Sequence, residues 1–144
     1  MIQKDKELLL KDLCARLSYK TYVKTVKGIG YVYAINTSQL VELSVANDSE
    51  YWSEVFNIDE IKPYLRPLSS MTEEEKKDIL QLLNIHGDID NEGNLLLGVE
   101  CNIVTLKVCK KYLGELNKRM FDVCHMIEKG LALEAPEGMY TLNK

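Results

Sequence analysis

The feature that most constrains this chain is a change in the spacing of its apolar residues near residue 19. Before that point, apolar side chains recur at helical spacing with charged residues between them: Leu9, Leu10, Leu13, Cys14 and Leu17. This spacing predicts an amphipathic helix over about residues 4–17. From there to residue 58, β-branched and aromatic residues dominate and short turns interrupt them. That pattern is typical of an antiparallel meander.

Three turns divide the meander. Lys27 and Gly28 separate residues 22–26 from residues 29–35 and predict a hairpin. Turns at residues 36–38 and 47–49 then predict further strands over residues 40–45 and 51–58. Because apolar and polar residues alternate over residues 40–45, we expect one face of the sheet to be in contact with water.

Tyrosines mark one face of the predicted hairpin. Tyr31 and Tyr33 share a strand face, and Tyr22, Tyr51 and Trp52 lie on neighbouring segments. An exposed aromatic sheet face could hold a peptide or stack bases. We instead expect these tyrosines to be core, because the apolar face of the first helix needs a sheet to cover.

Two prolines interrupt the pattern after residue 60. Pro63 and Pro67 remove backbone donors and favour extended conformations before them, so residues 61–68 are predicted to be a connector and not a regular central strand or helix. An exposed connector stiffened by prolines would suit docking to a partner. The alternative is a strap across the sheet edge with Tyr64 and Leu65 buried. The candidate partner-binding residues are Pro63, Tyr64, Leu65, Arg66 and Pro67.

Helical spacing returns in the second half. Thr72 and Glu75 form a capping box that predicts a helix over residues 72–83. A polar loop over residues 86–94 and a strand over residues 95–103 follow. The next helix is predicted from a stripe of Leu106, Cys109, Leu113, Leu116 and Met120. A last short helix is predicted from Met126 to Leu133, closed by Gly130, with a turn at residues 135–138.

These segments predict one α+β domain over residues 1–144, with the N-terminal helix packed on a mainly antiparallel sheet and additional helices in the second half. A chain of 144 residues with 46% hydrophobic residues has enough apolar material for one core.

Motifs for ion binding and catalysis are incomplete. Asp88, Asp90 and Gly93 match the start of a calcium loop, but Val99 stands where the closing glutamate is required. A hairpin or connecting loop is therefore the favoured interpretation, and weak cation binding by Asp88, Asp90 and Glu92 is the alternative. Cys124 and His125 are adjacent, which points them in different directions. The chain has no phosphate-binding or dinucleotide-binding glycine motif. We expect no catalytic residue, cofactor or metal.

The charge distribution argues against a protein that coats nucleic acid broadly, because the formal net charge is -4. Residues 101–144 are locally basic, and five cations there could contact phosphates. These candidate nucleic-acid contacts are Lys107, Lys110, Lys111, Lys118 and Arg119. A solvated helix face is the other interpretation.

Cellular location is constrained by apolar runs and cysteines. The chain has no signal-peptide core near its N-terminus and no apolar run of about 20 residues, so we expect neither export nor membrane insertion. Four scattered cysteines fit reduced thiols in the cytoplasm.

Three stretches, Leu8–Leu17, Ile61–Glu75 and Ile127–Pro136, resemble a family of small uncharacterised proteins. That family is encoded by gut commensal bacteria and their phages and mobile elements. The resemblance implies no activity, cofactor or site residue. Because the chain has the resources to build a core and no convergent set of catalytic residues, we expect a non-enzymatic cytoplasmic protein-interaction module, associated with a phage or mobile element. The alternative is a nucleic-acid-associated accessory protein that uses the basic helix near residues 107–119.

Overall fold

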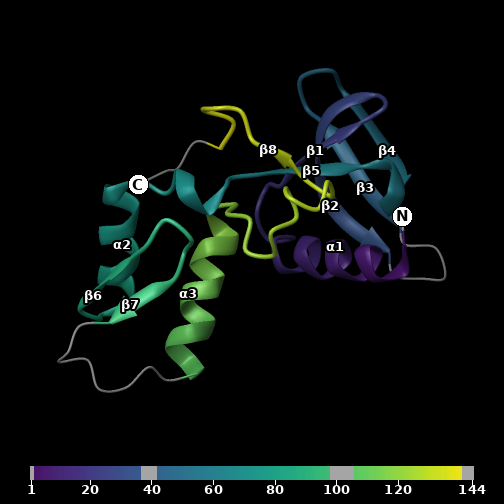
Figure 1. Ribbon diagram of the computed structural model, residues 1–144. Coiled ribbons are helices and arrows are strands. Elements are labelled where there is room, and N and C mark those ends of the chain that lie inside the picture. The colour runs from purple at the N-terminus through teal and green to yellow at the C-terminus, as the bar shows by residue number, and fades with distance from the viewer. Residues whose placement is uncertain (1, 37–41, 98–105, 141–144) are drawn as a thin grey trace.

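The computed structural model describes residues 2–36, 42–97 and 106–140 (Figure 1). An N-terminal helix lies against a mostly antiparallel six-stranded sheet, and further helices lie in the second half. The expected α+β fold is therefore confirmed. Residues 40, 41 and 98–103 of the predicted strands lie outside the described residues.

The elements follow one another in the order α1 (Gln3–Ala15), β1 (Tyr22–Thr25), β2 (Gly28–Asn36), β3 (Glu42–Asn47), β4 (Trp52–Asn57), η1 (Ile58–Glu60), β5 (Lys62–Leu65), η2 (Leu68–Ser70), α2 (Glu73–Leu83), β6 (Gly87–Ile89), β7 (Leu95–Leu97), α3 (Leu106–Lys118) and β8 (Leu133–Glu134).

The first half confirms the predicted helix and meander. Strands β1 to β4 pair antiparallel in succession, and the large sheet has the order β4-β3-β2-β1-β5-β8. Helix α1 runs along one face of this sheet (Figure 1). Its Leu9 and Leu13 pack against inward-facing residues of the strands, including Val23, Val45 and Phe56. This is the first of two apolar clusters.

The expectation that residues 61–68 are a connector without a regular central strand is wrong for Lys62–Leu65, which form β5. Strand β5 pairs antiparallel with β1 and parallel with β8. Pairing with β8 begins at Tyr64, one residue after Pro63. Among the described residues, Pro63 therefore has a partner strand on one side only, which is β1. Proline lacks a backbone N–H, and it is tolerated at such a position because no second strand there needs a donor.

The second half builds its own apolar cluster from α2, α3 and the β6–β7 hairpin, with Ile79, Ile89 and Phe121 at its centre. Helix α2 begins as predicted: Thr72 Oγ1 accepts from the Glu75 amide at 3.1 Å, and Glu75 Oε1 accepts from the Thr72 amide at 3.3 Å. Residues 86–94 were expected to be a loop, but Gly87–Ile89 pair with β7 and leave only residues 90–94 as the connection.

The short helix predicted from Met126 to Leu133 is wrong. Residues 126–130 form turns, and Leu133–Glu134 form strand β8, so no helix is present over this segment. Only the closing position is as expected, because Gly130 has the positive φ of 74° that is typical of a glycine at a helix C-cap. Asp122 instead accepts hydrogen bonds from the amides of Met126 and Ile127 and folds the segment into turns. Met126 and Leu131 nevertheless pack into the first cluster.

Two arginines join the halves at the C-terminal end of α3. Arg16, fully buried at the end of α1, donates to the carbonyl oxygens of Asn117 at 3.2 Å and Phe121 at 2.6 Å. Arg66 donates to the Arg119 carbonyl at 3.3 Å. A helix end leaves its last carbonyls without partners inside the helix, and here side chains from the first half of the chain supply the donors.

Candidate functional site

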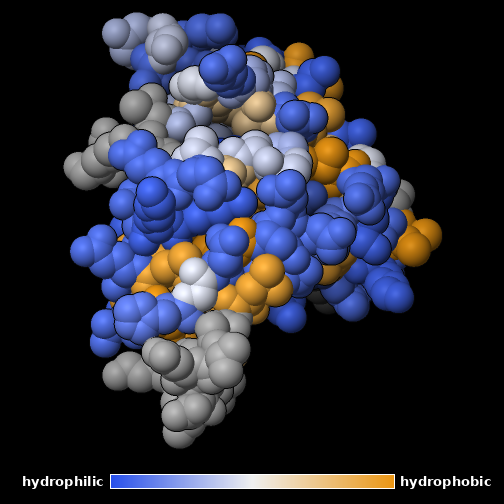
Figure 2. Space-filling model, turned by 60° about the vertical axis from the view of Figure 1, so that its left-hand side comes forward, coloured by the Kyte–Doolittle hydropathy of each residue, from blue (hydrophilic) through white to orange (hydrophobic). Residues whose placement is uncertain are grey.

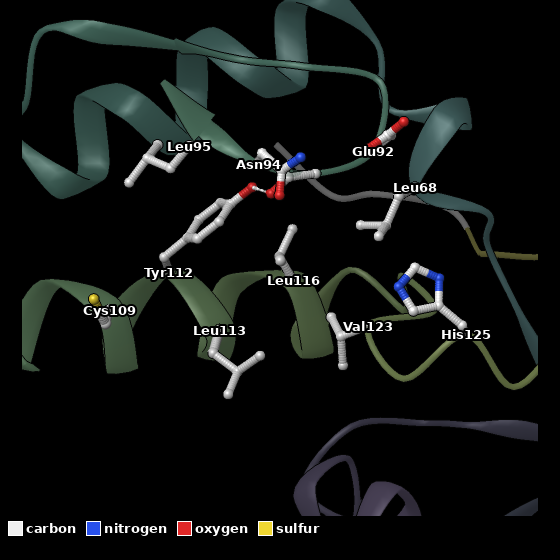
Figure 3. Close-up of a pocket in the computed structure, with 11 residues that line it drawn as sticks. Leu68, Glu92, Asn94, Leu95, Cys109, Tyr112, Leu113, Leu116, Val123 and His125 are labelled. Carbon is white, nitrogen blue, oxygen red and sulfur yellow. Dashed lines mark hydrogen bonds between the residues drawn. The ribbon is translucent and has the colours of Figure 1, made fainter. Parts of the chain in front are cut away.

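The described residues form a cleft of about 560 Å³ along the exposed side of α3 (Figure 3). Its apolar lining comes from η2, β7, α3 and the segment after α3: Leu68, Leu95, Leu113, Leu116 and Val123. A volume of this size falls within the range of ligand sites. Figure 2 shows apolar surface between hydrophilic residues on the side of the molecule that carries α2, α3 and the β6–β7 hairpin.

Helix α3 exposes part of the apolar stripe from which the helix was predicted. Leu116 is buried, but Leu113, less than one turn before it, is 48% exposed, and Cys109 is exposed as well. Tyr112 and Val108 pack against the second cluster instead. Cys109 and Leu113 lie outside the second cluster, because the helix is rotated so that its Val108, Tyr112 and Leu116 edge meets α2 and the hairpin. The side chain of Leu106 lies outside the described residues.

The wall opposite α3 is held in place by Tyr112. Its hydroxyl donates to the Gly93 carbonyl at 2.7 Å, and Figure 3 shows the ring reaching from α3 toward Asn94. Burial, with a smaller contribution from the negative charge of Asp90, raises the pKa of Tyr112 to about 12. The hydroxyl therefore stays protonated near neutral pH and acts as a fixed donor.

Gly93 is required for the shape of this wall. Its φ of +82° lies in the left-handed region, and a Cβ atom there would come within 2.8 Å of Leu68 Cδ2. The loop therefore approaches η2 more closely than any side chain would allow, and this contact sets one end of the cleft.

His125 stands at the far end of the cleft, beside Leu68 and Val123 (Figure 3). It is an exposed residue with a positive φ, which is uncommon outside glycine. Its neighbour Cys124 packs against the first cluster, and burial, followed by the charge of Asp12, raises the pKa of that thiol. The two adjacent residues thus face different parts of the molecule, as expected from the sequence.

In the loop over residues 90–94, the Asp90 carboxylate accepts hydrogen bonds from residues of the same loop. Asp90 Oδ1 accepts from the amides of Glu92 and Asn94, and Asp90 Oδ2 accepts from Asn94 Nδ2 at 3.1 Å. Hydrogen bonding from the Asn94 amide is the main reason that the pKa of Asp90 is lowered. Within the described ranges, no group of three or more His, Cys, Asp or Glu residues is arranged to hold a metal ion.

The candidate partner-binding residues lie within the sheet and at the junction of the two halves. Pro63 and Leu65 are buried, and Tyr64 and Pro67 are half-buried. Arg66 forms a bidentate pair with Glu75, with Nη2 to Oε1 at 2.7 Å and Nη1 to Oε2 at 3.0 Å. Its guanidinium also lies 4.2 Å from the Phe121 ring centroid. Of the two interpretations of this segment, the buried one matches the placement of Leu65.

The five basic candidates are not one free surface. Lys110 and Lys118 are exposed, but Lys111 Nζ donates to the Leu82 carbonyl at 2.8 Å. Arg119 pairs with Glu115 at 3.5 Å and lies 3.9 Å from Glu75. The side chain of Lys107 lies outside the described residues.

The expectation that Tyr31 and Tyr33 are core residues beneath the first helix is wrong. Helix α1 covers the opposite face of the sheet, where Val23, Val32 and Val45 are buried. Tyr33 is 52% exposed, and Tyr31 is half-buried. An antiparallel sheet needs only one covered face, so the valines and not the tyrosines meet the helix.

The sequence did not point to Leu68, Gly93, Asn94 and Val123 as neighbours of α3. These positions come together only through the packing of η2, the hairpin loop and the segment after α3. A comparison with models of known protein families, with curated proteins and with solved structures finds no match. None of the helices in the described part of the chain combines the length and apolar character needed to cross a bilayer.

Proposed function

We propose that this protein is a non-enzymatic protein-interaction module that receives an apolar segment of a partner in the α3 cleft. The observation that carries the proposal is the course of the α3 stripe. Leu116 is buried, yet Leu113 and Cys109 continue the same stripe into an open cleft. A contiguous apolar surface of this kind, rimmed by polar residues, is typical of an interaction site, whereas single exposed apolar residues are not.

The chemistry of the cleft favours side-chain anchoring over catalysis. Its walls are mainly leucine and valine, which suits one or two apolar anchors of a partner. The polar groups of the hairpin wall are already engaged, since Tyr112 bonds Gly93 and Asp90 bonds its own loop. His125 and Glu92 remain at the rim, where they would contact backbone or polar groups of the bound segment.

The test uses a displayed library of random peptides of about 12 residues, selected on the wild-type protein. We expect the selected peptides to carry apolar residues at i and i+4 spacing. Binding is then measured by fluorescence anisotropy on the wild type, Leu113→Glu and Leu82→Glu. Leu82 is a matched control, because it is 45% exposed on α2 and does not line the cleft.

Leu113→Glu is expected to weaken binding at least about tenfold, since a buried anchor position typically contributes 2 kcal/mol or more. Leu82→Glu is expected to bind as the wild type does. The proposal fails if the peptides bind Leu113→Glu with wild-type affinity, or if the selection yields peptides without apolar residues.

We place this module in the cytoplasm. Three of its cysteines, Cys14, Cys109 and Cys124, are free thiols, which suits a reducing compartment. The resemblance of Ile61–Glu75 to proteins of gut bacteria, phages and mobile elements suggests that the partner is a host or phage protein. Nucleic-acid binding by the basic helix is the second candidate, but internal bonds already use Lys111 and Arg119.

A further inference from the structure

The sheet face turned away from α1 carries tyrosines and lysines on neighbouring strands, and we name it the tyrosine face. Its residues on β1, β2 and β5 are Tyr22, Lys24, Ile29, Tyr31, Tyr33, Lys62 and Tyr64. We propose that the tyrosine face binds single-stranded nucleic acid, with bases stacked on tyrosine and phosphates held by lysine. This site is separate from the α3 cleft.

Two lysines on this face are placed where they repel one another. Lys24 on β1 and Lys62 on β5 are direct cross-strand partners, and both are exposed. Like charges directly opposite each other destabilise a sheet. Among the described residues neither lysine makes an ion pair. An anion bound between them would remove the repulsion, so the pair is complementary to a phosphate.

Tyr33 provides a platform for a base. Its hydroxyl lies 2.9 Å from Ser53 Oγ on β4, although Tyr33 itself belongs to β2. Strands are about 4.8 Å apart, so the side chain must lie nearly flat across β3 to reach a strand two positions away. Ala46, paired with Ser53, leaves room for it because its side chain is small. The side chain is therefore held at the surface, and Tyr33 is 52% exposed.

Asp48, an acidic residue beside Tyr31 on this face, is already paired. Asp48 accepts from the Tyr31 hydroxyl at 3.0 Å and lies 3.5 Å from Lys20 Nζ. The same Lys20 lies 4.3 Å from the centroid of the Tyr31 ring. This cluster neutralises Asp48, so its charge opposes a phosphate backbone less than a free carboxylate would.

The spacing suits a flexible strand. Lys24 lies on β1, and the Tyr33 ring lies across β3, so the two are two strand spacings apart across the sheet. They are also offset by two residues along the strands, and standard sheet dimensions then place them about 12 Å apart. Single strands can place a phosphate at one point and an unstacked base at the other, whereas a duplex keeps its bases stacked inside. With a net charge of -4, the protein should bind weakly and with strong salt dependence.

The test is fluorescence anisotropy with a labelled single-stranded oligothymidylate of about 12 nucleotides and a duplex of the same length, at about 25 and 200 mM salt. We expect binding to the single strand at low salt and little at high salt. Tyr33→Ala is expected to weaken it about fivefold or more, while Tyr33→Phe, which keeps the ring, retains most of the affinity. Lys24→Gln with Lys62→Gln should lower the salt slope by about 1.4.

Two controls identify the surface. Tyr51→Ala removes a tyrosine that is 92% exposed in the turn before β4, and Lys110→Glu with Lys118→Glu reverses two exposed charges on α3. Both are expected to bind as the wild type does. No binding at low salt, equal binding of the duplex, unchanged binding by Tyr33→Ala, or loss of binding in the α3 variant would each overturn the proposal. Leu113→Glu should leave it unchanged, which separates this result from the test of the cleft.

Discussion

Replacing Arg16 with methionine tests whether the junction between the halves is a major source of stability. Arg16 Nε and Nη2 donate to the two carboxylate oxygens of Asp12 at 2.8 and 2.9 Å, and the guanidinium also bonds the Asn117 and Phe121 carbonyls. Methionine would leave the buried Asp12 carboxylate without its cation. Removal of one partner from a buried ion pair costs about 3 to 5 kcal/mol.

That loss would be a large part of the total stability, which is about 5 to 15 kcal/mol for a typical domain. At about 2 to 4 °C per kcal/mol for a chain of this size, Tm should fall by about 6 to 20 °C. The double variant Asp12→Leu with Arg16→Met removes the stranded charge as well. We expect it to be more stable than Arg16→Met alone by at least about 1 kcal/mol.

Urea unfolding measures both effects, with far-ultraviolet circular dichroism reporting helices and Trp52 fluorescence reporting the first half. The free energy of unfolding is compared among the wild type, both single variants and the double variant. A loss below about 1 kcal/mol in Arg16→Met would refute the reasoning, and so would a double variant no more stable than Arg16→Met.

Three further predictions concern stability. Burial disfavours the charged form of Glu75, but hydrogen bonds and charge from Arg66, with hydrogen bonds from Thr72, hold its pKa below the ordinary value. The contribution of the Glu75 carboxylate to the free energy of unfolding is therefore present above the unfolded pKa of about 4.3 and is lost as the pH falls through the folded pKa. In an acid titration followed by circular dichroism, Glu75→Gln should lack this pH-dependent loss of stability. Gly30→Ala should destabilise the protein by about 1 to 3 kcal/mol, because the new Cβ would lie 2.7 Å from the Ala46 carbonyl oxygen. Gly114→Ala in α3 should stabilise it by about 0.5 to 1 kcal/mol, because nothing lies within 4 Å of the new Cβ. Thermal melts in which both variants shift Tm in the same direction would contradict this pair of predictions. Thr72→Ala should cost about 1 kcal/mol in urea unfolding through loss of the α2 cap, and an unchanged midpoint would mean that the cap does not stabilise the folded protein.

The sequence predicted the parts of the fold that depend on local patterns. The helix that became α1, the hairpin of β1 and β2, and the Thr72 capping box each rest on residues close together in the chain. The pattern failed at β5, because the pairing of Tyr64 with Leu133 joins residues far apart in sequence. It also failed over Met126–Leu133, where the apolar residues have helical spacing and pack into the core, but the backbone forms turns.

The candidate site was predicted less well than the fold. Helical spacing identified Cys109, Leu113 and Leu116 as one stripe, but it could not tell whether the stripe faced a core or an open cleft. That choice depends on how the hairpin and η2 pack against α3. Similarly, the alternation in β1 and β2 placed Tyr31 and Tyr33 on one face, but the position of α1 decided which face was covered.

The parallel pair of β5 and β8 has a consequence for synthesis of the chain. Leu65 leaves the ribosome well before Glu134, its partner in β8. At about 5 to 20 residues per second, the delay between them is about 3 to 14 seconds. During this time the growing chain can form β1 to β5, but one side of β5 has no strand to pair with. The new protein therefore presents an open sheet edge to its surroundings until its last strand arrives.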